Sequence, residues 1–238
     1  TVRHAWEALA ELLAAGDAEG ILCDVGMPVL HRGVRYNARV FVLGREVLLV
    51  RPKSDLADDG EYRESRWFAA WRKHRAVERF ALPPVVREVA GQRDTVIGDA
   101  VIETRDARLA AELCEELFTP EAAHVPLGLD GVDIVANASA SHHELRKMAA
   151  RLRRIRAATE TSGGAYLYAN QRGCDGGRLY FDGGAPQPDA PGRRAGPLPH
   201  RPRRRRADAD RRRPGAQPGV RAGPPRPRGG DRARPGLL

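Results

Sequence analysis

Apolar positions in the first 53 residues follow a helical period and then a strand period. Trp6, Leu9 and Leu13 are spaced as on one face of a helix, and Gly16 follows as a stop signal, so we expect a helix over residues 6–13. The next apolar runs are short and rich in Val and Leu, as in strands. Three strands are predicted here, the last two joined by a hairpin at 43–45: residues 21–28, 35–43 and 46–51.

The following 120 or so residues mix both patterns. Residues 54–75 carry charges and aromatic side chains without periodicity, which indicates a long surface excursion. Residues 107–114 fit either a helix face or a strand, residues 145–159 fit a basic amphipathic helix, and residues 159–164 fit a connecting turn. Further strand-like runs occur at residues 95–104, 131–137 and 165–170. Strands that alternate with helices indicate a layered α/β fold.

The periodicity stops after residue 185. Residues 186–238, called the C-terminal tail below, hold 12 Pro, 8 Gly and 15 Arg, and no Ile, Lys or aromatic residue. Such a segment cannot bury enough apolar surface to offset its ordering entropy, so we expect it to be disordered. The predicted organisation is one domain at residues 1–185 and a disordered basic tail at residues 186–238.

The net charge of +9 arises in the tail. Residues 186–238 carry +11, whereas residues 1–185 carry −2 and are nearly neutral. A basic balance ordinarily suggests a nucleic-acid partner, but here that argument concerns the tail alone. An Arg-rich tail can neutralise phosphates, although this one lacks the aromatic residues of base-stacking modules.

Cysteine usage and hydropathy indicate a cytoplasmic chain. Cys23, Cys114 and Cys174 cannot all pair with one another and show no CxxC spacing, so reduced thiols are expected. No apolar run reaches the ~20 residues that span a bilayer, and no membrane association is predicted. The chain opens without an initiator Met or a signal-peptide core, so we expect it to begin within a domain.

Cys114 and Lys53 are the candidate catalytic residues. A cysteine nucleophile needs its thiolate, and therefore a nearby base or cation, and acyl transfer also needs a donor where the oxyanion forms. Cys114 lies in the run Glu-Leu-Cys-Glu-Glu, whose acids disfavour a thiolate, and spacing alone does not place Lys53 beside it. A buried packing cysteine remains the alternative.

Eight sequence blocks raise the case for catalysis. In order and spacing they resemble the glutaminase domain of glutamine-dependent NAD synthetases, the eukaryotic type in particular. They are Cys-Asp-Val-Gly-Met-Pro-Val (23–29), His-Arg-Gly-Val-Arg-Tyr-Asn (31–37), Leu-Leu-Val-Arg-Pro-Lys (48–53), Tyr-Arg-Glu-Ser-Arg-Trp-Phe (62–68), Glu-Leu-Cys-Glu-Glu-Leu-Phe-Thr-Pro (112–120), Gly-Leu-Asp-Gly-Val-Asp (128–133), Asn-Ala-Ser-Ala-Ser-His-His-Glu-Leu-Arg-Lys (137–147) and Ala-Asn-Gln-Arg-Gly-Cys-Asp-Gly-Gly-Arg-Leu-Tyr-Phe-Asp-Gly (169–183).

The resemblance implies a nitrilase-type α-β-β-α sandwich with a Glu-Lys-Cys triad. By motif position Cys114 matches the nucleophile and Lys53 the lysine that stabilises the oxyanion. Glu64, Ser141 and Lys147 match positions near the substrate glutamine. Without the resemblance, a solvated lysine, a loop acid and a turn serine are the ordinary interpretations of such residues.

The implied reaction is hydrolysis of the glutamine side-chain amide through a glutamyl thioester. The lysine and the backbone N–H after Cys114 stabilise the oxyanion, and ammonia leaves. In complete enzymes the ammonia passes to a synthetase domain that uses ATP and Mg to convert deamido-NAD to NAD. The glutaminase part itself is expected to need no cofactor and no metal, and the full enzyme to be a homo-oligomer.

The chain departs from the family pattern at both ends. The triad glutamate lies in an N-terminal Gly-Pro-Glu-type motif that has no match here, since Glu7 and Glu11 lie on the first predicted helix. Loss of a general base typically costs ~10²–10⁴-fold in rate, so we expect impaired activity and a sandwich that is incomplete at both ends. The match also stops where the tail begins, which favours a frame shift or mispredicted exon over a genuine tail.

Three further features are interpreted as structural. His142 and His143 are adjacent, and neighbouring side chains on a strand diverge, which argues against a metal site. The Ser-Gly-Gly segment at 162–164 lacks the Asp-Ser that completes a pyrophosphate-binding loop, and Cys174 lies in a Gly-rich segment typical of a loop.

Three functions stay open on this basis. The first is the glutaminase part of an NAD synthetase, which the blocks at 62–68 and 137–147 favour. The second is another nitrilase-type amidase that acts on a small amide. The third is a nucleic-acid-binding protein that acts through the Arg-rich tail.

Overall fold

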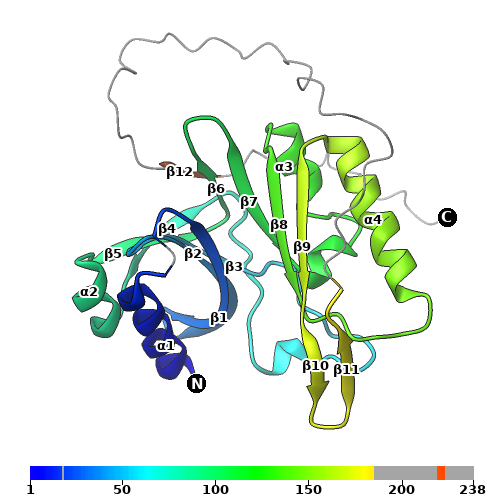
Figure 1. Ribbon diagram of the computed structural model, residues 1–238, viewed down its shortest axis with the longest axis horizontal. Coiled ribbons are helices and arrows are strands. Elements are labelled where there is room, and N and C mark those ends of the chain that lie inside the picture. The colour runs from blue at the N-terminus through cyan, green and yellow to red at the C-terminus, as the bar shows by residue number, and fades with distance from the viewer. Residues whose placement is uncertain (18, 185–218, 223–238) are drawn as a thin grey trace, which may run out of the picture.

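Two five-stranded sheets pack face to face, and helices cover the outer face of each (Figure 1). The computed structural model describes residues 1–17, 19–184 and 219–222. Three clusters of buried side chains correspond to the three interfaces between the four layers. The α-β-β-α sandwich expected from the sequence is confirmed.

The first sheet has the strand order β1-β2-β3-β5-β4. Its strands are β1 (Leu22–His31), β2 (Val34–Leu43), β3 (Glu46–Pro52), β4 (Val77–Ala81) and β5 (Asp94–Gly98). The strands β1, β2 and β3 form an antiparallel meander, and β3 then runs parallel to β5, with Leu49 opposite Val96. The outer face is covered by α1 (Val2–Ala15) and α2 (Pro84–Ala90).

The second sheet carries three parallel strands, and this determines where the site lies. Its order is β12-β6-β7-β8-β9. The strands are β6 (Ala100–Glu103), β7 (Arg108–Leu113), β8 (Ile134–Ser139), β9 (Ala165–Asn170) and β12 (Gly219–Ala222). Because β7, β8 and β9 are parallel, their carboxyl ends lie next to one another at the same end of the sheet. The outer face is covered by α3 (His124–Leu129) and α4 (Lys147–Ser162), and a hairpin of β10 (Arg172–Asp175) and β11 (Leu179–Asp182) follows.

Alternation along β7 separates two environments. Leu109 and Ala111 pack between the sheets, against Phe41 and Leu49 of the first sheet. The intervening residues face α3 and α4, as the contacts of Ala110 in the second core show. The strand that precedes Cys114 therefore has one purely apolar face and one face where polar side chains can be placed.

Most predicted elements are confirmed, with adjusted ends. The first strand does not stop at Pro28 but continues to His31. Strand β1 tolerates this proline because it lies at the edge of the sheet, where a missing N–H is acceptable. Residues 107–114, left open between helix and strand, form β7, where Leu109 and Leu113 serve the sheet core instead of a helix face. The excursion at residues 54–75 is irregular, apart from a single 3-10 turn at Glu64–Arg66.

Three sequence predictions need correction. The turn predicted at 159–164 is too long, because α4 runs to Ser162 and only the two glycines that follow, each with positive φ, lead into β9. A side chain at Gly164 would place its Cβ 2.3 Å from the backbone oxygen of Asp133, so only glycine fits this turn. Cys174 lies in strand β10, because this segment pairs with Leu179–Asp182, instead of in a structural loop.

The third correction concerns the tail. Residues Gly219–Ala222 form β12, which pairs with β6 so that Val220 lies opposite Ile102. An unpaired sheet edge offers backbone donors and acceptors to any extended segment, and here β6 presents such an edge. The remainder of the predicted disordered tail lies outside the described residues.

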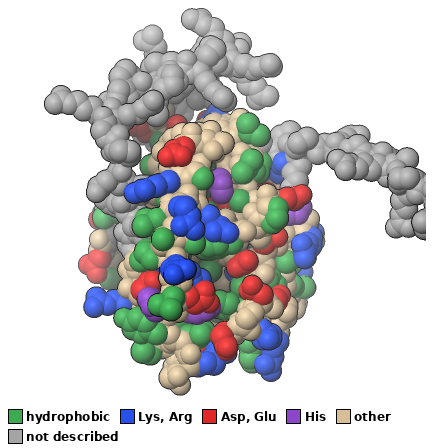
Figure 2. Space-filling view, turned by 90° about the vertical axis from the view of Figure 1, so that its right-hand side faces the viewer, with side chains coloured by type: hydrophobic (Ala, Val, Ile, Leu, Met, Phe, Trp, Pro, Cys, Tyr) green, Lys and Arg blue, Asp and Glu red, His purple; other side chains and the backbone are tan. Residues whose placement is uncertain are grey.

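The helix α4 is basic and amphipathic, as predicted, but begins at Lys147. Arg153, Arg154 and Arg156 are exposed, whereas Ile155 and Arg151 are buried. Figure 2 shows Lys and Arg side chains among acidic ones on the corresponding side of the molecule. No described helix combines the length and apolar character that crossing a bilayer requires.

Besides β10 and β12, the sequence analysis missed β4, α2, α3 and β11. Of these, α2 has a recognisable signal, because Pro84 occupies its first turn and Gly91 ends it in a left-handed conformation. The helix α3 has only 6 residues, too few for a periodic pattern.

Candidate active site at the strand ends

The predicted site residues gather where strands end. Lys53 directly follows β3, Cys114 directly follows β7, and Ser141 comes two residues after β8. Glu64 lies in the excursion after β3, and Lys147 is the first residue of α4. The fold thus brings residues separated by almost one hundred positions to one region.

Lys53 and Glu64 form a nearly buried ion pair. Their side chains are 3% and 12% exposed, and Nζ lies 2.5 Å from Oε2. Glu64 also accepts hydrogen bonds from Asn37 Nδ2 at 2.7 Å and from the Ala57 N–H at 2.8 Å. A buried pair needs such additional donors to offset its desolvation. Spacing in the sequence did not show this pairing.

Cys114 occupies a strained turn. It follows the last residue of β7 and opens a 3-10 turn, Cys114–Leu117, with a φ of 42°. A non-glycine residue in this left-handed region costs about 1–2 kcal/mol, and such strain persists where the surrounding structure enforces it. Its backbone N–H donates to Asn137 Oδ1 at 3.1 Å.

Two of the acids that flank Cys114 in the sequence are buried and bonded to other side chains. Glu116 is fully buried and is held by Arg51 Nη1 at 2.6 Å and by Ser54 Oγ at 2.7 Å. Glu112 is also fully buried and has partners of its own. The sequence analysis expected this acidic run to oppose a thiolate. For Glu112 and Glu116, hydrogen-bond donors from neighbouring residues offset the negative charge.

Glu115 is the acid that lies among the site's charges. Burial raises the pKa of this carboxyl, Asp59 and Glu64 add to the rise, and Lys53 and Lys147 oppose it. Lys53, Glu64 and Lys147 are thus all close enough to act on one side chain. The residue after Cys114 is therefore under the electrostatic influence of two lysines.

Tyr62 joins the excursion to the loop after β8. Its hydroxyl donates to the Ala140 carbonyl at 2.5 Å and accepts from the His142 N–H at 3.1 Å. Burial raises the pKa of Tyr62 to about 12, and the neighbouring Cys114 adds to the rise. The hydroxyl therefore stays protonated at neutral pH and acts as a hydrogen-bond donor within electrostatic range of the candidate nucleophile.

The loop between β8 and α4 holds Ser141 and Lys147. Ser141 is buried and both of its backbone groups bond to the side chain of Asn170. Lys147 Nζ lies 3.3 Å from Glu144 Oε2 and 3.4 Å from His142 Nδ1. The loop therefore presents a serine and a lysine from a backbone that is held at several points.

The sequence analysis assumed that the two adjacent histidines lie on a strand, but they lie in this loop. His142 contacts Tyr62 and Glu144, whereas His143 packs its ring edge-on against Tyr180. Within the described ranges, no three His, Cys, Asp or Glu side chains are arranged to hold a metal ion.

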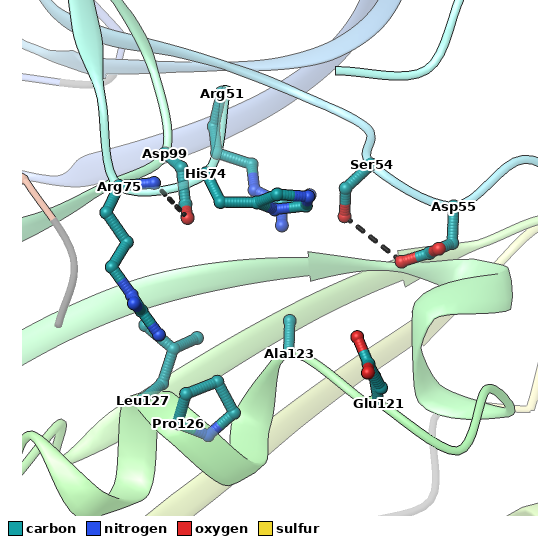
Figure 3. A pocket seen from close by; sticks show the side chains of 10 residues that line it. All are labelled: Arg51, Ser54, Asp55, His74, Arg75, Asp99, Glu121, Ala123, Pro126 and Leu127. Atoms are coloured by element: carbon teal, nitrogen blue, oxygen red, sulfur yellow. Dashed lines mark hydrogen bonds between the residues drawn. The ribbon is translucent and has the colours of Figure 1, made fainter. Parts of the chain in front are cut away.

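A small polar cavity adjoins the site without containing it (Figure 3). Its volume is about 30 Å³, roughly the share of one water molecule in the liquid. Arg51 and Ser54, which both hold Glu116, form one wall. The complete lining is Arg51, Ser54, Asp55, His74, Arg75, Asp99, Glu121, Ala123, Pro126 and Leu127. Neither Cys114 nor Lys53 reaches it.

The two N-terminal acids lie in a different layer from Cys114 and Lys53. Glu7 and Glu11 lie on α1, in the helix layer outside the first sheet, and Glu7 pairs with Arg3 at 2.8 Å. The residues that sequence reasoning overlooked are amides and a phenol: Asn37, Tyr62, Asn137 and Asn170. Each belongs to one of the eight blocks, and three are polar residues at or near strand ends, which was the available signal.

Comparison with known proteins agrees with the fold and with the eight blocks. The sequence matches the family described as carbon-nitrogen hydrolase over residues 4–185. It is 53% identical over 184 residues to a glutamine-dependent NAD(+) synthetase of Dictyostelium discoideum, which covers 77% of this chain and 26% of the relative. The corresponding protein of Saccharomyces cerevisiae is 53% identical over 180 residues, covering 76% of this chain and 25% of the relative.

A solved structure gives the same result. The glutamine-dependent NAD(+) synthetase of Cytophaga hutchinsonii superposes with a TM-score of 0.64 at 29% identity, covering 76% of this chain and 28% of that one. The chain thus spans about a quarter of the length of the curated relatives it matches. With the four layers, the strand-end site and these matches together, the chain belongs to the carbon-nitrogen hydrolase family.

Proposed function

We propose that this chain is the glutamine-hydrolysing part of a glutamine-dependent NAD synthetase. The observation that carries the proposal is the position of Cys114, in a strained turn at the end of β7. The next residue, Glu115, has a carboxyl pKa that both Lys53 and Glu64 affect. The relatives named above support the choice of glutamine as substrate. In the complete protein, a synthetase domain would use ATP and Mg to convert deamido-NAD to NAD with the released ammonia.

The reaction begins at the thiolate of Cys114. Sγ attacks the side-chain amide carbon of glutamine and forms a tetrahedral oxyanion. The carbon–nitrogen bond then breaks, ammonia leaves with the proton from the thiol, and a glutamyl thioester remains. Water hydrolyses the thioester to glutamate and restores the thiol. No cofactor enters these steps.

The oxyanion donors follow from the hydrogen bonds. The Cys114 N–H already donates to Asn137, so it does not serve the oxyanion. Lys53 Nζ and the backbone N–H of Glu115 remain as the pair of donors. Removing one donor from an oxyanion hole typically costs ~10²–10³-fold in rate.

Substrate recognition is assigned to the two flanking segments. Lys147 supplies a positive charge for the α-carboxylate of glutamine, and Ser141 supplies a hydroxyl near the α-amino and α-carboxylate groups. Glu64 keeps Lys53 in place through their 2.5 Å contact and lies near the reacting amide. The sequence has no match to the family motif that carries the triad glutamate, so hydrolysis by this chain alone is expected to be slower by ~10²–10⁴-fold than with a base present.

We further propose a cytoplasmic, homo-oligomeric complete enzyme. The three cysteines are free, which fits a reducing compartment. The partner of this domain is the synthetase domain that would consume its ammonia. The proposed function assigns no role to nucleic acid.

The test is covalent labelling by an electrophilic glutamine analogue, followed by peptide mass spectrometry. Cys114 should be labelled in preference to Cys23 and Cys174, although Cys174 is the most exposed of the three. Lys53→Met should slow this labelling, and the matching asparagine analogue should react poorly. Equal labelling of all three thiols would contradict the site. Equally fast reaction with a small aliphatic amide analogue would favour a different amidase.

A further inference from the structure

A continuous chain of buried hydrogen bonds lies behind Cys114. Asn137 accepts the Cys114 N–H at Oδ1 and donates from Nδ2 to the Tyr166 hydroxyl at 2.9 Å. The Tyr166 hydroxyl donates in turn to Glu112 Oε2 at 2.5 Å. Glu112, Asn137 and Tyr166 are 0%, 2% and 5% exposed. Every donor in this chain points toward the carboxylate of Glu112.

Strand register brings these three side chains together. In the parallel pair β7–β8, Glu112 lies opposite Asn137. In the pair β8–β9, Tyr166 lies opposite Val135, two residues before Asn137 and therefore on the same face of the strand. That face is the one covered by α3 and α4, so the chain of hydrogen bonds is closed off from solvent.

The far end of the chain is a buried negative charge. The backbone N–H of His124 donates to Glu112 Oε1 at 3.1 Å, and its ring Nδ1 lies 3.0 Å from the same oxygen. Burial raises the pKa of Glu112, but the bonds from His124 and Tyr166 outweigh it and lower the pKa overall. The carboxylate is therefore ionised at neutral pH. In a low-dielectric interior such a charge polarises a chain of hydrogen bonds cooperatively.

Packing alone does not account for this arrangement. A buried carboxylate with directed donors is typically no more stabilising than apolar residues of the same volume. The face of β7 that lies between the sheets is apolar, with Leu109 and Ala111 packed there, which shows that this strand tolerates such residues. Glu112, by contrast, lies on the opposite face of β7, two residues before the residue with a φ of 42°.

We propose that Asn137, Tyr166 and Glu112 form a positioning relay that holds the Cys114 amide and keeps this residue in its left-handed turn. The relay rests on the proposed function, because it positions the nucleophile of that reaction. It commits the Cys114 N–H to Asn137 and leaves the N–H of Glu115 for the oxyanion. Its members touch neither substrate nor the reacting atoms.

The test compares two variants of the full chain with a matched control. Tyr166→Phe removes the hydroxyl that accepts from Asn137 Nδ2 and leaves this side chain bonded only to the Ser139 hydroxyl and the Cys114 N–H. Asn137→Leu removes the acceptor itself while it keeps the volume. The control is Tyr180→Phe, which removes a tyrosine hydroxyl from the exposed surface of β11. For each protein, the rate of Cys114 labelling is measured against the concentration of the glutamine analogue.

The relay predicts a split between rate and binding. The maximum labelling rate should fall about tenfold for Tyr166→Phe and up to ~100-fold for Asn137→Leu, because small misplacements of a reacting atom have effects of this size. The half-saturating concentration should change less than twofold. Hydrogen exchange at the Cys114 amide should accelerate in both variants, while Tyr180→Phe matches the unsubstituted chain.

The outcomes separate the two proposals. Selective labelling of Cys114 at an unchanged maximum rate in both variants, with unchanged amide exchange, would overturn the relay and leave the function standing. Faster amide exchange with unchanged labelling would also overturn it. Absence of selective labelling in the unsubstituted chain would overturn the proposed function. Labelling of Cys23 by a general thiol reagent, unchanged among the variants, shows that the fold is intact.

Discussion

Asn170 holds Ser141 by both of its backbone groups. The Ser141 N–H donates to Asn170 Oδ1 at 2.9 Å, and the Ser141 carbonyl accepts from Nδ2 at 3.0 Å. The same amide nitrogen also lies 2.8 Å from Asp182 Oδ1, and Asp182 is 3.1 Å from the fully buried Arg151. A loop without regular secondary structure is thereby tied to the end of β9 and to α4.

This clamp predicts an effect on substrate binding. Asn170→Ala removes the partner of the Ser141 N–H and leaves the Ser141 carbonyl with Arg151 Nη2 alone, at 3.3 Å, so the loop loses part of the geometry that presents its side chain. The half-saturating concentration of a glutamine analogue should rise about tenfold, since one or two hydrogen bonds are lost at roughly 1 kcal/mol each. The maximum labelling rate of Cys114 should change little. A fall in maximum rate at unchanged half-saturation would show that Asn170 serves the nucleophile instead of the substrate loop.

The Lys53–Glu64 pair makes a prediction about stability. Glu64→Leu leaves the lysine charge buried without its partner, and breaking a buried pair on one side typically costs about 3–5 kcal/mol of unfolding free energy. Both side chains are mostly buried, so solvent screening is weak here. The double variant Lys53→Met with Glu64→Leu should be considerably more stable than Glu64→Leu alone, because no uncompensated charge remains.

Chemical denaturation of all four proteins measures this coupling as a double-mutant cycle. As a comparison, Arg79→Met tests an exposed pair, since Arg79 is 79% exposed and bonds to Asp94. That change should alter the unfolding free energy by less than about 1 kcal/mol. If Glu64→Leu behaved like Arg79→Met, Lys53 and Glu64 would not form the buried pair seen here.

Much of the fold follows from local patterns. The spacing of Trp6, Leu9 and Leu13 specified α1, and the short apolar runs on either side of Gly44 specified the β2–β3 hairpin. In contrast, Leu109 and Leu113 fit both periods, because a stretch of six residues is too short to separate them. Only the neighbouring strands decide such a case, and these are remote in sequence.

The motif resemblance proposed the site residues, but the contacts among them could not be predicted. Motif resemblance singled out Lys53 and Glu64, yet their contact depends on how an irregular excursion folds back, which no periodicity encodes. The polar partners of Glu112 are contributed by β9 and α3. From the sequence alone, a carboxylate near Cys114 is therefore expected to repel a thiolate. Only the sheet register shows which donors offset its charge.

Tyr62 provides the last prediction, which links mobility to activity. Its hydroxyl is the contact between the excursion at residues 54–75 and the Ala140 carbonyl, and it also accepts the His142 N–H. Tyr62→Phe keeps the ring beside His142 but releases these bonds. The excursion should then open more often, so that trypsin cleaves after the exposed Arg66 several-fold faster. Labelling of Cys114 should slow about tenfold, as expected for a small loss of positioning.

The pH dependence gives an independent check on the same hydroxyl. The pKa of Tyr62 is raised to about 12 in the folded chain, above its ordinary value of about 10. A group whose folded pKa is raised stabilises the fold fully below its unfolded pKa and loses that contribution as pH rises through the folded one. The stability difference between the unsubstituted chain and Tyr62→Phe should therefore be constant below about pH 10 and shrink between about pH 10 and 12. A difference that vanished near pH 7, or a cleavage rate equal in both proteins, would show that Tyr62 does not tie the excursion to the substrate loop.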